Sequence, residues 1–101
     1  MFDMKNLSRL RNLNKHTPDA ERAFGAFEKA VFAEGVLSVQ QKQLMAVAVA
    51  LTTQCPYCIE IHNAAARSAG ATDAQLAETA QVAIIMRAGA AKTHSSHLFA
   101  D

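Results

Sequence analysis

The sequence has no tryptophan, no run of like charges and no long hydrophobic segment. Its 10 Lys and Arg residues nearly balance its 9 Asp and Glu residues, so the formal net charge is +1. Without a basic patch, the chain lacks the electrostatic footprint of proteins that bind nucleic acid or an anionic membrane surface. The longest apolar stretch runs only from Leu44 to Leu51, far short of the about 20 residues that span a membrane. We therefore expect neither nucleic acid nor membrane as a partner.

The N-terminal residues also lack the apolar segment of a secretory signal peptide. The chain begins Met1-Phe2-Asp3-Met4-Lys5, which mixes charged and apolar side chains. This start predicts a cytoplasmic protein, and a structural disulfide would not persist in that reducing compartment. A closely spaced cysteine pair is then more often catalytic or metal-binding.

No segment alternates apolar and polar residues as a half-buried strand does, and no internal repeat is present. We interpret residues 1–16, with their mixed charge, as an N-terminal arm. Residues 17–101 are predicted to form a single all-α domain of about five helices. The predicted helices cover residues 17–34, 38–53, 55–70, 72–89 and 90–99.

Local signals support these helix starts. Thr17-Pro18 and Cys55-Pro56 each place a capping residue before a proline at the first helical position. Capping boxes begin at Ser38 and Thr72. Gly89 is expected to bend or end the fourth helix, because glycine weakens a helix interior.

Both cysteines lie at the start of the third predicted helix, and His62 follows Cys58 by four residues. On a helical wheel Cys55, Cys58 and His62 fall within roughly 60° of one another. A helix N-terminus stabilises a thiolate, which is the reactive form of cysteine. The pattern therefore indicates thiol redox chemistry on one helix face.

The positions of the cysteines relative to His62 indicate which thiol has which role in the reaction. Cys58 is the better candidate for attack on a peroxide, because His62 at i+4 can exchange a proton with it. Cys55, at the outer end, is placed to resolve a sulfenic acid and to meet a partner thiol. Tyr57 either packs beside the pair or shapes access to it.

Other interpretations remain open. The cysteines could be inert packing residues. Alternatively Cys55, Cys58, His94 and His97 could form a Cys2His2 zinc site in a zinc-stabilised binding module, which would leave His62 without a role.

Gln43 is a further candidate, twelve residues before Cys55 in the apolar helix. If the second and third helices form an antiparallel hairpin, its side chain lies near the level of His62. An interhelical polar role and a role in the site are both open from the sequence.

The segment from about Leu37 to about His97 resembles the carboxymuconolactone decarboxylase and alkyl hydroperoxidase D-like superfamily. The resemblance rests on four stretches of the sequence: Leu37-Ser38, Ala46-Val47-Ala48-Val49-Ala50, Cys55-Pro56-Tyr57-Cys58-Ile59-Glu60-Ile61-His62, and Ala64-Ala65-Ala66 followed by Ala69-Gly70-Ala71-Thr72. It implies an all-helical subunit that assembles as a homotrimer or homohexamer. It also implies hydroperoxide reduction through the cysteine pair, regenerated by a thiol/disulfide reductant protein or a small dithiol, without a metal or organic cofactor.

One position departs from the family pattern. The similar peroxidases carry a glutamate where this chain has Gln43, and the glutamate acts with the histidine in a proton relay. Glutamine can orient His62 but cannot take up a proton at neutral pH. Weak peroxidase activity is therefore expected, unless His94 or His97 substitutes, and a redox-sensing or structural oligomer with little turnover is the main alternative. Decarboxylase members lack the cysteine pair, so resemblance to them implies the fold rather than the reaction.

The apolar helix also predicts oligomerisation independently of the resemblance. Its side chains from Leu44 to Leu51 face all directions, more than one small subunit can cover. We expect a closed assembly with the cysteine site near a subunit boundary.

Overall fold

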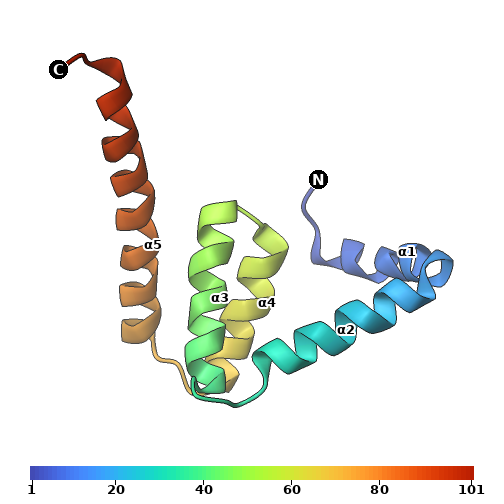
Figure 1. Cartoon of the computed structure of the whole chain (residues 1–101). Coiled ribbons are helices and arrows are strands. Elements are labelled where there is room, and N and C mark those ends of the chain that lie inside the picture. Colours follow the sequence, from blue (N-terminus) through green and yellow to red (C-terminus); the bar gives the residue numbers. More distant parts are fainter. The chain divides into compact units, whose positions relative to one another are not determined.

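The computed structural model describes all 101 residues and contains only helices (Figure 1). The helices are α1 (Leu10–His16), α2 (Pro18–Phe32), α3 (Val39–Thr53), α4 (Pro56–Ser68) and α5 (Asp73–His94), with 3-10 turns η1 (Met4–Arg9) and η2 (Ser95–Leu98). The prediction of an all-α fold with about five helices is confirmed. None of the helices combines the length and the apolar character needed to cross a membrane.

Two compact units divide the chain, Met1–Val39 and Gln40–Asp101. The predicted arm, residues 1–16, belongs to the first unit and is helical, forming η1 and α1. The predicted boundary between residues 16 and 17 falls where α1 gives way to α2, and it stays a prediction.

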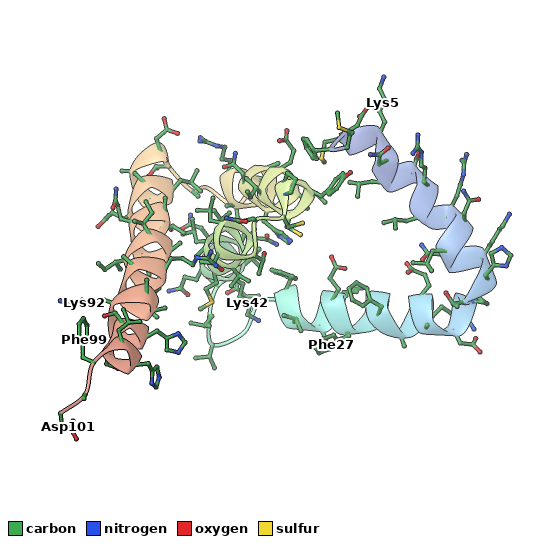
Figure 2. The ribbon with its side chains drawn as sticks, turned by 90° about the horizontal axis from the view of Figure 1, so that it is seen from above. Lys5, Phe27, Lys42, Lys92, Phe99 and Asp101 are labelled. Carbon is green, nitrogen blue, oxygen red and sulfur yellow. The ribbon has the colours of Figure 1, made fainter.

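The first unit consists of η1, α1 and α2, and none of the residues in these helices is buried. Pro18 occupies the first turn of α2 as expected, but the Thr17 side chain does not cap this helix. Its hydroxyl instead donates to the Leu13 carbonyl oxygen at 3.0 Å, closing the end of α1. Phe27 of α2, labelled in Figure 2, keeps 68% of its surface exposed.

In the second unit, α3 and α4 run antiparallel as a hairpin (Figure 1). Gln54 turns the chain between them with a left-handed φ of 58°. The buried apolar side chains are all small or medium in size: Val47, Ala50, Ala66, Ala71 and Ala83. Alanines let helix backbones approach closely, but they contribute little apolar area, so the core of this unit is thin.

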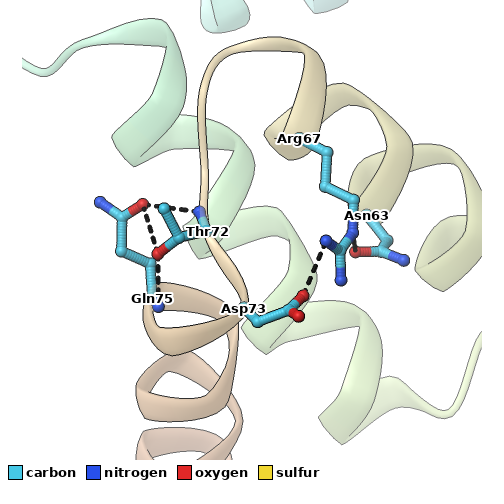
Figure 3. Close-up of polar contacts among 5 residues, drawn as sticks. All are labelled: Asn63, Arg67, Thr72, Asp73 and Gln75. Carbon is cyan, nitrogen blue, oxygen red and sulfur yellow. Dashed lines mark hydrogen bonds and ion pairs between the residues drawn. The ribbon is translucent and has the colours of Figure 1, made fainter.

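The start of α5 is fixed by the predicted capping box. The Thr72 hydroxyl accepts the Gln75 N–H at 3.2 Å, and the Gln75 side-chain oxygen accepts the Thr72 N–H at 2.8 Å (Figure 3). Arg67 at the end of α4 forms an ion pair with Asp73 at 2.8 Å (Figure 3).

The prediction that Gly89 ends or bends this helix is wrong about the ending, because α5 continues to His94. A single glycine costs a helix interior only about 1 kcal/mol relative to alanine. The alanines on both sides of Gly89 are strong helix formers, and they offset this cost.

A chain of amide hydrogen bonds joins the three helices at the end of the hairpin away from the cysteines. Gln40 donates its side-chain N–H to the Ala69 carbonyl oxygen at 3.1 Å and accepts from the Gln75 side chain at 3.0 Å. Gly70 adopts a left-handed φ of 94° beside them, so a glycine is required at this turn. This network holds the hairpin and α5 together.

Candidate redox site

The N-terminus of α4 positions both thiols. Cys55 is the N-cap residue, with an extended backbone (φ −96°, ψ 102°), and Pro56 occupies the first turn. The Cys55 Sγ atom accepts the backbone N–H of Cys58 at 3.3 Å. The cysteine therefore takes the place that serine or aspartate usually occupies at a helix start.

The two sulfur atoms are close and unbonded. The Sγ atoms of Cys55 and Cys58 lie 2.7 Å apart and share a hydrogen bond, and both side chains are partly exposed. A disulfide bond has a length of about 2.05 Å, so only small side-chain movements separate the dithiol from the disulfide.

The surroundings shift the two thiol pKa values in opposite directions. The pKa of Cys55 is lowered, first by the hydrogen bond with the Cys58 side chain and then by the backbone N–H groups of Cys58 and Tyr57, which outweigh partial burial. The pKa of Cys58 is raised, first by its hydrogen bond with Cys55, then by burial and by the negative charge on Cys55. Cys55 is therefore the more acidic of the two thiols, whereas the residue pattern predicts that Cys58 attacks the peroxide.

His62 is held from the neighbouring helix. Its Nδ1 atom lies 2.7 Å from Oε1 of Gln43 on α3, and Gln43 is the buried polar side chain of the unit, 9% exposed. An amide oxygen only accepts hydrogen bonds, so Nδ1 of His62 is the donor in this contact. The hairpin thus brings Gln43 and His62 together, and Gln43 orients the imidazole.

The secondary candidates lie in different places. Tyr57 is half-buried in the first turn of α4, and its backbone N–H helps to stabilise the Cys55 thiolate. His94 and His97 are exposed at the end of the chain, with ring centroids 5.8 Å apart. No group of three or more His, Cys, Asp or Glu side chains comes together to hold a metal ion. The Cys2His2 zinc alternative therefore has no assembled ligand set within one chain.

Two residues that position the cysteine pair were not predicted from the sequence. Gln54 adopts the left-handed conformation that aims Cys55 at the N-terminus of α4. Arg87 of α5 donates to the Thr52 carbonyl oxygen at 2.9 Å and so caps the last turn of α3, three residues before Cys55. The short connection between two predicted helices could have indicated the tight turn at Gln54, but no local signal pairs Arg87 with Thr52.

Comparison with known proteins gives a consistent family. The sequence model of the carboxymuconolactone decarboxylase family matches residues 18–101. Uncharacterized protein 4 in the cox locus of Paracoccus denitrificans is 54% identical over 78 residues, which cover 77% of this chain and 70% of that protein. An uncharacterised protein of Cupriavidus necator is 34% identical over 88 residues, which cover 87% of this chain and 78% of that protein.

Solved structures show the same fold. A carboxymuconolactone decarboxylase family protein from Legionella pneumophila aligns with a TM-score of 0.76 and 30% identity, over 81% of this chain and 73% of that one. A protein from Methanobacterium thermoautotrophicum aligns with a TM-score of 0.82 and 35% identity, over 87% of this chain and 99% of that one.

Proposed function

The chain belongs to the carboxymuconolactone decarboxylase family, and from this premise we propose that it is a thiol-dependent hydroperoxide reductase. The family includes enzymes of both decarboxylase and peroxidase type. The observation that carries the proposal is the unbonded thiol pair, 2.7 Å apart at a helix N-terminus, beside an imidazole held by Gln43.

The proposed reaction is a two-electron reduction. The dithiol form of Cys55 and Cys58 converts ROOH to ROH and water, and the two cysteines become a disulfide. A thiol/disulfide reductant protein or a small dithiol then restores the dithiol by exchange through a mixed disulfide. The reaction requires no metal or organic cofactor, and the cytoplasm supplies suitable reductants.

Steady-state turnover of an organic hydroperoxide tests this proposal. Purified protein with dithiothreitol as electron donor should consume cumene hydroperoxide faster than the same mixture with the Cys55→Ser/Cys58→Ser double variant. Equal rates for the two proteins would refute the enzyme. The double variant keeps the site's shape, so it also controls for the uncatalysed reaction of the donor.

Gln43 favours a second candidate function, a redox-sensing oligomer with little turnover. Because the amide cannot take a proton from His62, the cysteine pair could oxidise reversibly without supporting rapid cycling. Stoichiometric, dithiol-reversible disulfide formation without catalytic peroxide consumption would favour the sensor over the enzyme.

A further inference from the structure

Gln43, the hydrogen-bond partner of His62, cannot exchange a proton with the imidazole. Its Nδ1–H donates to the amide oxygen of Gln43 at 2.7 Å, and that amide neither gains nor loses a proton near neutral pH. A carboxylate in this place would strengthen His62 as a base, but glutamine supplies no negative charge. Gln43 therefore orients His62 but supplies no negative charge beside it.

The surroundings of Cys55 stabilise a thiolate better than those of Cys58. Its Sγ atom caps α4 and accepts the Cys58 N–H at 3.3 Å, at the positive end of a 13-residue helix. The two sulfur atoms lie 2.7 Å apart, so when Cys55 is ionised the S–H of Cys58 is close enough to donate to it. The backbone N–H of Cys58 therefore donates to the Cys55 sulfur, and the Cys58 thiol lies beside that same atom.

Peroxide cleavage also needs an acid, because an alkoxide is a poor leaving group. The S–H of Cys58 lies beside the sulfur that attacks, so it is next to the oxygen–oxygen bond as that bond breaks. Once the charge has left Cys55, nothing holds the proton on Cys58 against a strongly basic alkoxide. The thiol pair thus contains both a nucleophile and an acid.

We propose, as a refinement that rests on the proposed function, that Cys55 attacks the hydroperoxide and that Cys58 protonates the leaving oxygen before it closes the disulfide. The Cys55 thiolate attacks the terminal oxygen of ROOH, the O–O bond breaks, and the alkoxide takes the Cys58 proton to leave as ROH. Cys55 is then a sulfenic acid and Cys58 a thiolate. The Cys58 thiolate attacks the Cys55 sulfur, hydroxide leaves and becomes water with a solvent proton, and the disulfide is complete.

This order reverses the assignment expected from the sequence, in which proximity to His62 made Cys58 the attacking thiol. His62 then acts as a positioning residue beside the pair. The proposal therefore predicts that the identity of the reacting cysteine changes with the charge at position 43.

Partial alkylation locates the thiolate without any peroxide. Reduced protein treated near neutral pH with less than one equivalent of iodoacetamide should carry the label mainly on Cys55, as located by peptide fragmentation in a mass spectrometer. Gln43→Glu should shift the label toward Cys58, because the carboxylate makes His62 a stronger base. Preferential labelling of Cys58 in the unaltered protein would overturn the proposal.

Trapping the sulfenic acid tests the chemical step. With cumene hydroperoxide and dimedone, the Cys58→Ser variant should form the dimedone adduct on Cys55. Adduct formation should be slower than the loss of thiols in the wild type, by up to about 100-fold, because a serine hydroxyl is a weaker acid than the Cys58 thiol. The Cys55→Ser variant should form little adduct. Rapid adduct formation on Cys58 in the Cys55→Ser variant would refute the assigned order. Labelling of Cys55 with no peroxide consumption by any form would instead refute the proposed function and leave the thiolate at Cys55.

Discussion

Gln43 is the residue whose chemistry most constrains this site. It is buried and reaches His62 from a different helix, with 2.7 Å between Oε1 and Nδ1. A glutamate of nearly the same shape would make the same contact and carry a charge. A Gln43→Glu substitution would therefore place a charge beside the imidazole while keeping the contact.

We predict that Gln43→Glu raises the rate of hydroperoxide turnover, because the carboxylate adds a proton acceptor to the Gln43–His62 pair. The gain should reach about tenfold or more, within the range of general acid–base catalysis. Steady-state cumene hydroperoxide reduction with dithiothreitol measures it. Gln43→Leu is the matched control, since it fills the space without a hydrogen bond and should lower the rate. Equal rates for the Glu and Gln forms would show that proton transfer at this position does not limit turnover.

The shifted thiols give a pH prediction. Because the folded pKa of Cys55 is lowered, this thiol should be alkylated at pH values below the ordinary thiol pKa of about 8.5, where the unfolded chain reacts slowly. Ionisation of Cys55 therefore stabilises the fold above the unfolded pKa, and this contribution is lost as the pH falls through the folded pKa. The raised pKa of Cys58 acts in the opposite sense, so its stabilising effect is lost as the pH rises through that pKa.

Iodoacetamide rates for the native and urea-unfolded protein, between about pH 6 and pH 10, measure these shifts. Peptide fragmentation in a mass spectrometer locates the label, so the rates of Cys55 and Cys58 are followed separately in the unaltered protein, where each thiol keeps its partner. Superimposed native and unfolded profiles for Cys55 would contradict the hydrogen-bond assignment at the start of α4.

At the scale of elements, the junction between α4 and α5 concentrates several specific contacts. Thr72 and Gln75 cap the N-terminus of α5, and Arg67 pairs with Asp73 across the turn (Figure 3). Gly70 turns the chain with a left-handed backbone. Each of these contacts is made by a named side chain or turn residue, so a single substitution can remove it.

Thr72→Ala should lower the free energy of unfolding by about 1 kcal/mol, because it leaves the Gln75 N–H at the helix start without its side-chain acceptor. Urea denaturation at a fixed protein concentration measures the change. Thr93→Ala is the control, since that hydroxyl donates to carbonyl oxygens of Gly89 and Ala90 within the same helix. A loss at Thr93 as large as that at Thr72 would argue against the cap.

Two glycines should respond to alanine in opposite directions. Gly70→Ala should destabilise the protein by about 1–2 kcal/mol, because φ is 94° and a Cβ atom would lie 3.3 Å from the Gln40 side-chain nitrogen. Gly89→Ala should stabilise it by about 0.5–1 kcal/mol, because its position is helical and a Cβ atom meets nothing within 4 Å. Urea midpoints of the two variants test both signs, and a stabilised Gly70→Ala form would contradict the turn geometry.

At the scale of the whole molecule, large apolar side chains remain exposed. Val82, Ile84, Ile85 and Met86 of α5 each keep 57–65% of their surface exposed, and no large side chain of the chain is fully buried. An exposed apolar surface of this kind usually marks an interface. We propose a homotrimer or homohexamer, in which closed symmetry covers the surface.

Light scattering coupled to size-exclusion chromatography should give three or six times the 10.9 kDa chain mass at micromolar concentration. Ile85→Lys should reduce this mass, because it places a charge in the apolar surface of α5. Ala64→Lys, which adds the same side chain at an exposed position of α4, outside the apolar surface of α5, is the matched control and should assemble normally. A wild-type monomer would refute the proposed assembly.

Helix-level features with local causes were predictable from particular residues. The Thr72 capping box, the Cys55-Pro56 start of α4 and the absence of strands all follow from neighbours in sequence, and the structure confirms them. The prediction that Thr17 caps α2 is wrong, because its hydroxyl donates to the Leu13 carbonyl oxygen of the preceding helix instead. The helix α5 continues through Gly89 because the summed helix propensity of the neighbouring residues offsets the cost of one glycine. A prediction from the glycine alone does not include that sum.

The sequence by itself determined the all-α class and the placement of both cysteines in one helical turn, because a spacing of three residues and a helix start are short-range properties. It also indicated that Gln43 and His62 would share a level, once an antiparallel hairpin was assumed. Only the tertiary structure decided that these two side chains are in contact, that His94 and His97 do not come together with the cysteines within one chain, and that the sulfur of Cys55 accepts the backbone N–H of Cys58. Those outcomes depend on the relative positions of atoms on different turns and helices, which packing sets and a residue pattern does not contain.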